Sequence, residues 1–146
     1  MSSEDDCTEN ECIKGIEESI DELCKEGETY LDGGAFRLAY DRFDKALKLI
    51  PEPKKEQETT TWILGQLAEI YHQLQDFKAV KKALIFAMEC PGGVENPFLQ
   101  LRLGQAYYEL DEMDQAKLHL QIALDKEGQT IFGFDDPKYH EFITAH

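Results

Sequence analysis

The chain has 146 residues, of which 42% are apolar, and its formal net charge is −15 at pH 7. A chain of this length can bury one ordinary core, so we expect a single domain, and its apolar runs are too short for a membrane-spanning segment. The negative charge disfavours nucleic acids and anionic membranes as partners and favours a basic protein or peptide.

Residues 1–10 are expected to form an acidic, flexible tail before a domain over residues 11–146. The first 32 residues contain twelve acidic residues and two lysines, so most of the net charge lies there. The opening residues lack both the basic and the apolar region of a secretory signal. We therefore expect the protein in the cytoplasm.

Turn residues divide the rest of the chain into helices that are joined in pairs. Asp32-Gly33-Gly34, Gln75-Asp76 and Asp111-Glu112 are short breaks that predict antiparallel neighbours. Prolines and glycines after residues 50 and 90 mark the ends of the pairs. The predicted helices cover residues 11–31, 35–50, 57–74, 77–90, 96–110 and 113–127.

The chain ends with a seventh predicted helix, over about residues 136–145. Asp135 or Asp136 followed by Pro137 is typical of a helix start. Tyr139 and Phe142 then lie on one face of this helix. Because a stack of helix pairs exposes the apolar face of its last pair, we expect this helix to cap it.

Gly104 lies in the middle of a predicted helix, where glycine costs about 1 kcal/mol relative to alanine. It starts a spacing of small, aromatic and apolar residues that occurs three times in the chain. A small residue at each start predicts a close crossing of the two helices of a pair, opposite Ala116, Ala39 or Val80. The three copies are Gly27-Tyr30-Ala39-Phe43-Ala46, Ala68-Tyr71-Val80-Leu84-Ala87 and Gly104-Tyr107-Ala116-Leu120-Ala123.

This pattern resembles the tetratricopeptide repeat, a helix-turn-helix unit, although the tryptophan expected near its fourth position is absent. The resemblance implies an all-α, right-handed α-solenoid of three repeats, at about 20–53, 61–94 and 97–130, plus the C-terminal capping helix. The run WILGQLAEIYHQLQDF and the ending FGFDDPKYHEF also resemble small bacterial single-domain tetratricopeptide proteins, some of which are similar to immunity proteins of polymorphic toxins.

In tetratricopeptide repeats, one stripe on the first helix of each pair lines a concave groove. The stripe here contains five carboxylates, several aromatic residues and no lysine or arginine, which predicts an acidic groove that attracts a cationic segment. The sequence leaves open whether Trp62 and Phe98 face this groove or the core. The candidate partner-binding residues are Asp21, Glu28, Asp32, Trp62, Glu69, His72, Gln73, Phe98, Gln105, Tyr108 and Glu109.

The sequence contains no nucleophile elbow and no phosphate-binding loop, so catalysis is not expected. Cys7, Cys12, Cys24 and Cys90 form no C-x-x-C pair, so we expect free thiols, no metal site and no cofactor. Arg102 alone matches the basic clamp with which some chaperone-tail receptors of this family bind a terminal carboxylate, so that role is not expected.

The sequence therefore predicts a non-catalytic protein–protein interaction module that binds a basic protein or peptide, in the role of a toxin-neutralising immunity protein. The alternative is a secretion chaperone or adaptor that holds an extended client segment. A metal site that uses the cysteines is a third hypothesis, and the sequence leaves a homo-oligomer open.

Overall fold

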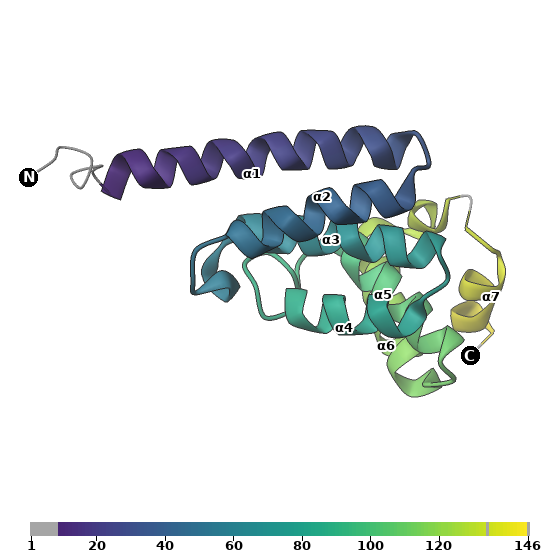
Figure 1. The fold of residues 1–146 in the computed structure, drawn as a ribbon. Helices are drawn as coiled ribbons and strands as arrows, with labels where there is room; N and C mark the ends of the chain where they lie inside the picture. The colour runs from purple at the N-terminus through teal and green to yellow at the C-terminus, as the bar shows by residue number, and fades with distance from the viewer. Residues whose placement is uncertain (1–8, 134, 146) are drawn as a thin grey trace, which may run out of the picture. The chain divides into compact units, whose positions relative to one another are not determined.

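The computed structural model describes residues 9–133 and 135–145, without the side chains of residues 9–11 and 13, and every regular element in this part is a helix (Figure 1). None of these helices is both long and apolar enough to cross a membrane. In chain order they are α1 (Glu9–Asp32), α2 (Phe36–Leu49), the 3-10 helix η2 (Lys54–Glu56), α3 (Glu58–Gln73), α4 (Phe77–Ala87), α5 (Pro97–Glu109), α6 (Met113–Glu127), the 3-10 helix η3 (Gln129–Phe132) and α7 (Lys138–Thr144).

The predicted all-α class is confirmed, and every predicted helix is present. The helix ends differ from the prediction by at most three residues: α4 ends at Ala87 rather than at residue 90, and α7 covers Lys138–Thr144 rather than 136–145. Most of the predicted acidic tail, together with Cys7, lies outside the described residues.

The chain folds as two compact units, one ending at Glu52 and the other starting at Pro53. The first unit contains the pair α1–α2, and the second contains α3–α4, α5–α6 and α7. The single domain over residues 11–146 stays a prediction.

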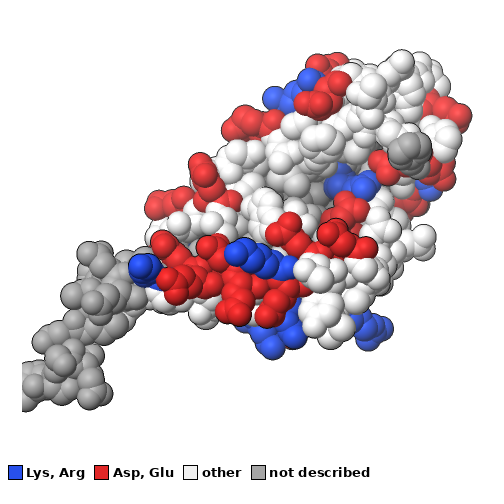
Figure 2. Space-filling model, turned by 90° about the horizontal axis from the view of Figure 1, so that it is seen from above, with Lys and Arg blue, Asp and Glu red and all other residues white. Residues whose placement is uncertain are grey.

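In the first unit, a glycine allows α1 to pack closely against α2. A Cβ atom built on Gly27 would lie 2.7 Å from Cζ of Phe43, whose side chain is completely buried. The opposite side of α1 is strongly charged, since this helix contains nine acidic residues and two lysines. Figure 2 shows acidic side chains of the described part of the chain gathered along this helix.

The second unit repeats the same device. A Cβ atom built on Gly104 of α5 would lie 2.7 Å from Cγ of Leu120 and 2.9 Å from its backbone nitrogen, on α6. The close crossings are as predicted, but the facing residues are not. Leu120 and Phe43, rather than Ala116 and Ala39, fill the space left by each glycine, because each lies one helical turn further along the second helix.

The end of the second unit is covered by η3 and α7. Tyr139 and Ile143 of α7 join Ile131 and Phe132 of η3 in one buried cluster with Leu101, Leu120 and Ala123 of the last helix pair. Since α7 buries apolar side chains that the pair α5–α6 would otherwise expose, it acts as the predicted cap.

Candidate functional site

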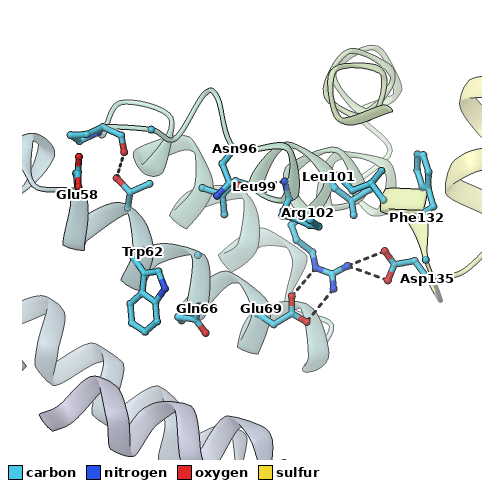
Figure 3. Close-up of a pocket in the computed structure, with 17 residues that line it drawn as sticks. Glu58, Trp62, Gln66, Glu69, Asn96, Leu99, Leu101, Arg102, Phe132 and Asp135 are labelled. Carbon is cyan, nitrogen blue, oxygen red and sulfur yellow. Dashed lines mark hydrogen bonds and ion pairs between the residues drawn. The ribbon is translucent and has the colours of Figure 1, made fainter. Parts of the chain in front are cut away.

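An open pocket of about 810 Å³ lies in the second unit, between α3 and α5 (Figure 3). Its two walls are the exposed faces of these first helices of each pair. The connection before α5 closes one end, and the segment that contains η3 and Asp135 closes the other. The lining includes Glu58, Trp62, Gly65, Glu69, Phe98, Leu99, Arg102, Phe132 and Asp135.

Local sequence signals place the side chains of both walls. On α3, Glu58 and Trp62 are four residues apart, and on α5 Phe98 and Arg102 have the same spacing, so each pair shares one helix face. The start of α5 is fixed by Asn96, whose Oδ1 accepts hydrogen bonds from the backbone N–H groups of the next two non-proline residues at 2.9 and 3.3 Å.

Gly65 lets the two walls approach each other. A Cβ atom built on Gly65 of α3 would lie only 3.1 Å from Cδ2 of Leu99 on α5. The glycine therefore contributes to the pocket by its lack of a side chain, since a Cβ atom there would require the Leu99 side chain to move by a few tenths of an ångström.

The two aromatic residues whose orientation the sequence left open both line this pocket. Trp62 is 41% exposed and Phe98 is 57% exposed. Two large aromatic side chains that line one pocket form a larger apolar area than scattered exposed residues do, and such areas are typical of interaction sites. They are the apolar contact area that the pocket offers to a ligand.

Arg102 lies at the centre of a network that joins three parts of the second unit. Its Nε and Nη2 donate to the two carboxylate oxygens of Glu69 at 2.9 and 3.1 Å, and its Nη1 is 3.3 Å from both carboxylate oxygens of Asp135. Nη1 also donates to Gln105 at 2.8 Å, and Gln105 donates to Asp135 at 3.0 Å. The network thus ties α3, α5 and the segment before α7 together (Figure 3).

The surroundings of Glu69 and Arg102 favour the charged form of each. Burial by itself raises the pKa of Glu69, but hydrogen bonds from Arg102 and its positive charge outweigh burial, so this pKa lies below its ordinary value. Burial lowers the pKa of Arg102, and the hydrogen bonds and charge of Glu69, with those of Asp135, raise it above its usual range. A bidentate guanidinium–carboxylate pair of this kind is geometrically rigid.

The structure brings three of the predicted partner-binding residues into the pocket: Trp62, Glu69 and Phe98. Gln73 lies beside them and donates a hydrogen bond to Glu69 at 2.9 Å. The three acidic candidates Asp21, Glu28 and Asp32 are exposed on α1, in the first unit.

His72 lies next to Gln73 but is half-buried. Its ring packs edge-on against Phe77, with 5.9 Å between the centroids, and its Nδ1 is buried without a hydrogen-bond partner in the described part of the chain. Burial and the positive charge of Arg102 lower the pKa of His72, which favours the neutral imidazole.

Three candidates on α5 are in different surroundings from those predicted. Gln105 is completely buried within the Arg102 network. Tyr108 packs edge-on against Tyr139 and Phe142 of α7, each at 5.3 Å. Neither residue lines the pocket, because Gln105 is buried in the Arg102 network and the capping helix α7 packs against Tyr108.

Glu109 is the third of these candidates. It accepts a hydrogen bond from the Tyr139 hydroxyl at 2.6 Å and forms an ion pair with Lys138 at 2.8 Å. Burial raises its pKa, but hydrogen bonds from Lys138 and Tyr139 bring it below its ordinary value. Its carboxylate is thus occupied by α7.

The sequence-based interpretation considered Arg102 only as a match to a basic clamp, and it included neither Arg102 nor the carboxylates of Glu58 and Asp135 among the partner-binding residues. Arg102 stands in a groove that was expected to contain no lysine or arginine. Its spacing of four residues from Phe98 could have indicated that the two side chains share one face of the helix. Asp135 is 33 residues from Arg102 and follows another helix, so no local spacing pointed to it.

The pocket lining contains no serine, cysteine or histidine, and its hydroxyl group, from Thr61, donates to the Pro91 carbonyl at 2.8 Å. Across the described residues, no group of three or more His, Cys, Asp and Glu side chains could hold a metal ion. Cys24 and Cys90 are buried free thiols.

No protein-family model matches the chain, and no curated protein matches it. Among solved structures, the crystal structure of MamA is similar, with a TM-score of 0.67 and 19% sequence identity over 93% of this chain and 71% of that one. MamA is a tetratricopeptide-like protein. The likeness concerns the fold, and it confirms the predicted one: the chain is an all-α, tetratricopeptide-like helical solenoid.

Proposed function

We propose that the chain is a non-catalytic protein-binding module, and that the pocket between α3 and α5 holds a peptide segment of its partner. The observation that carries this proposal is the pair of exposed aromatic side chains, Trp62 and Phe98, on the walls of a pocket whose polar groups are already held in place. Exposed aromatic anchors beside a fixed framework are typical of interaction sites, because binding then orders few side chains.

The partner segment is proposed to be basic. Glu58, Glu69 and Asp135 outnumber Arg102 in the lining, and Arg102 is already paired with two of these carboxylates. An incoming anion would have to displace them, whereas a lysine or arginine would meet the Glu58 carboxylate, which forms no ion pair within the described residues, and an aromatic face. The net charge of −15 also favours the approach of a basic partner.

We propose that the chain uses this pocket to bind and neutralise a basic toxin. The apolar part of the lining, which includes Leu99, Leu101 and Phe132, supports the alternative of a chaperone that holds an extended apolar client. Salt distinguishes the two. Binding of a basic segment weakens as salt rises, whereas binding of an apolar client resists salt and weakens in mild detergent.

Replacing Phe98 by alanine is expected to weaken peptide binding about tenfold or more. The probe is a fluorescein-labelled peptide selected from a random display library on the full chain, and the measurement is its fluorescence anisotropy on titration. Since the Phe98 side chain is largely exposed, the substitution should change the free energy of unfolding by less than about 1 kcal/mol.

Leu118→Ala is the matched control, because Leu118 is 51% exposed on α6 and does not line the pocket. It should leave the peptide affinity unchanged. Selected peptides that bind the Phe98→Ala variant as tightly as the unchanged chain would exclude the pocket as the binding site.

A further inference from the structure

A second surface of the second unit combines both signs of charge around an apolar centre. It borders a pocket of about 570 Å³ between α4 and the turn that joins α5 to α6. Ile85, which is 42% exposed, and Leu110 contribute the apolar lining, and the charged lining residues are Lys78, Lys81, Lys82 and Glu112. We call this region, together with Asp111 of the same turn and Met113 and Asp114 at the start of α6, the α4–turn surface.

One side of the α4–turn surface is basic. Helix α4 contains three lysines and no acidic residue, although the chain as a whole is strongly acidic. Lys81 binds both carboxylate oxygens of Glu112 at 2.8 Å and lies 5.3 Å from the centroid of the Tyr107 ring. Lys78 and Lys82 are exposed, and neither forms an ion pair within the described residues.

The other side is acidic. Asp111 stands on the turn between Leu110 and Glu112, and Asp114 lies in the first turn of α6. Both are exposed, and neither has an ion-pair partner in the part of the chain that the structure describes. The Lys81–Glu112 ion pair fixes this turn against α4. Met113, which is 37% exposed, adds apolar area between the two aspartates.

We infer that the α4–turn surface binds a second copy of itself about a two-fold axis. Such an axis places the basic side of each copy against the acidic side of the other, and places Ile85 and Leu110 of both copies together at the centre. Lys78 and Lys82 of each copy then face Asp111 and Asp114 of the other copy, so this contact occurs twice in one interface. The inference does not rest on the proposed function, because this surface shares no lining residue with the pocket of Trp62 and Phe98.

The mixed charge argues against other occupants. Nucleic acid or an anionic membrane would meet the carboxylates of Asp111, Glu112 and Asp114 beside the lysines. A uniformly basic protein would meet Lys78 and Lys82. A second copy of the same surface supplies the opposite sign at every unpaired charge.

The test is sedimentation velocity of the full chain over a range of concentrations. The unchanged chain should show a monomer–dimer equilibrium with a dissociation constant below about 1 mM. Lys78→Glu/Lys82→Glu and Asp111→Asn/Asp114→Lys should each raise this constant at least about tenfold, because like charges then face each other. A mixture of the two variants should form a heterodimer, since one surface is then acidic and the other basic.

Lys25→Glu/Lys126→Glu is the control for net charge, because it reverses two exposed lysines elsewhere. It should leave the dimer unchanged, while Ile85→Ser, at an exposed position, should weaken it. An unchanged chain that stays monomeric to about 1 mM overturns the inference. So does a dimer that survives both charge variants, or a mixture of those variants that does not associate.

Discussion

Replacing Gly93 by alanine is expected to lower the free energy of unfolding by at least about 3 kcal/mol. Gly93 is buried in the connection between α4 and α5, and a Cβ atom there would overlap the Ala87 carbonyl oxygen and lie 2.7 Å from the Ala87 carbonyl carbon. Both atoms belong to the backbone at the end of α4, so relief requires movement of the helix end or of the connection. Urea denaturation followed by circular dichroism measures the loss.

The adjacent Gly92 provides a matched control. It has a φ of 76°, but a Cβ atom there would meet nothing within 4 Å. Gly92→Ala should therefore cost only about 1 kcal/mol, from the left-handed backbone alone. If both alanine variants lose the same free energy, the close approach at Gly93 is not what the glycine provides.

Gly104→Ala is expected to destabilise the protein by about 2 kcal/mol, although alanine is the better helix former. The new Cβ would lie within 3 Å of Leu120 at both its side chain and its backbone nitrogen, so a rotamer change of Leu120 cannot remove the overlap. The helices α5 and α6 would have to separate. Thermal and urea denaturation measure the effect.

Gly15→Ala is the control for Gly104, because Gly15 also lies inside a helix and a Cβ atom there meets nothing within 4 Å. This substitution should stabilise α1 by up to about 1 kcal/mol. The opposite signs expected for two glycine-to-alanine changes in helices separate close packing from helix propensity. A stabilised Gly104→Ala variant would contradict the proposed crossing of α5 and α6.

The fold could be predicted from the sequence because the packing of each helix pair depends on residues with a regular spacing. Gly27 and Gly104 stand where the helices cross, and the breaks after Asp32, Leu74 and Leu110 set the turns. The identity of the facing residue could not be predicted in the same way. It depends on the relative shift of the two helices along their axes, which the spacing within each helix does not fix.

The candidate site was predictable where it follows one helix and not where it depends on the end of the chain. Trp62 and Phe98 share the stripe of their helices, and both line the pocket. Tyr108 and Glu109 belong to the same stripe, but Tyr139 and Lys138 of α7 occupy them. A helical period describes which residues share a face, and it carries no information on which later segment covers that face.

The charge of the pocket was only partly predictable. The acidic residue Glu69 was expected there, but its carboxylate is bound by Arg102, which also binds Asp135 from the segment before α7. Composition and stripe position give the number of charges on a surface. Which of them neutralise each other depends on contacts between residues 33 positions apart.

The most direct test of the account is to map a bound peptide on the chain by nuclear magnetic resonance. The probe is a peptide selected from a random display library, titrated into the ¹⁵N-labelled full chain, whose single tryptophan makes the Trp62 indole N–H signal unambiguous. We predict selected peptides that contain lysine or arginine, and shifts confined to that indole signal and to backbone amides of α3 and α5 around the pocket. Shifts that leave the Trp62 signal in place and cluster on the outer faces of α4 and α6 would contradict the proposed site.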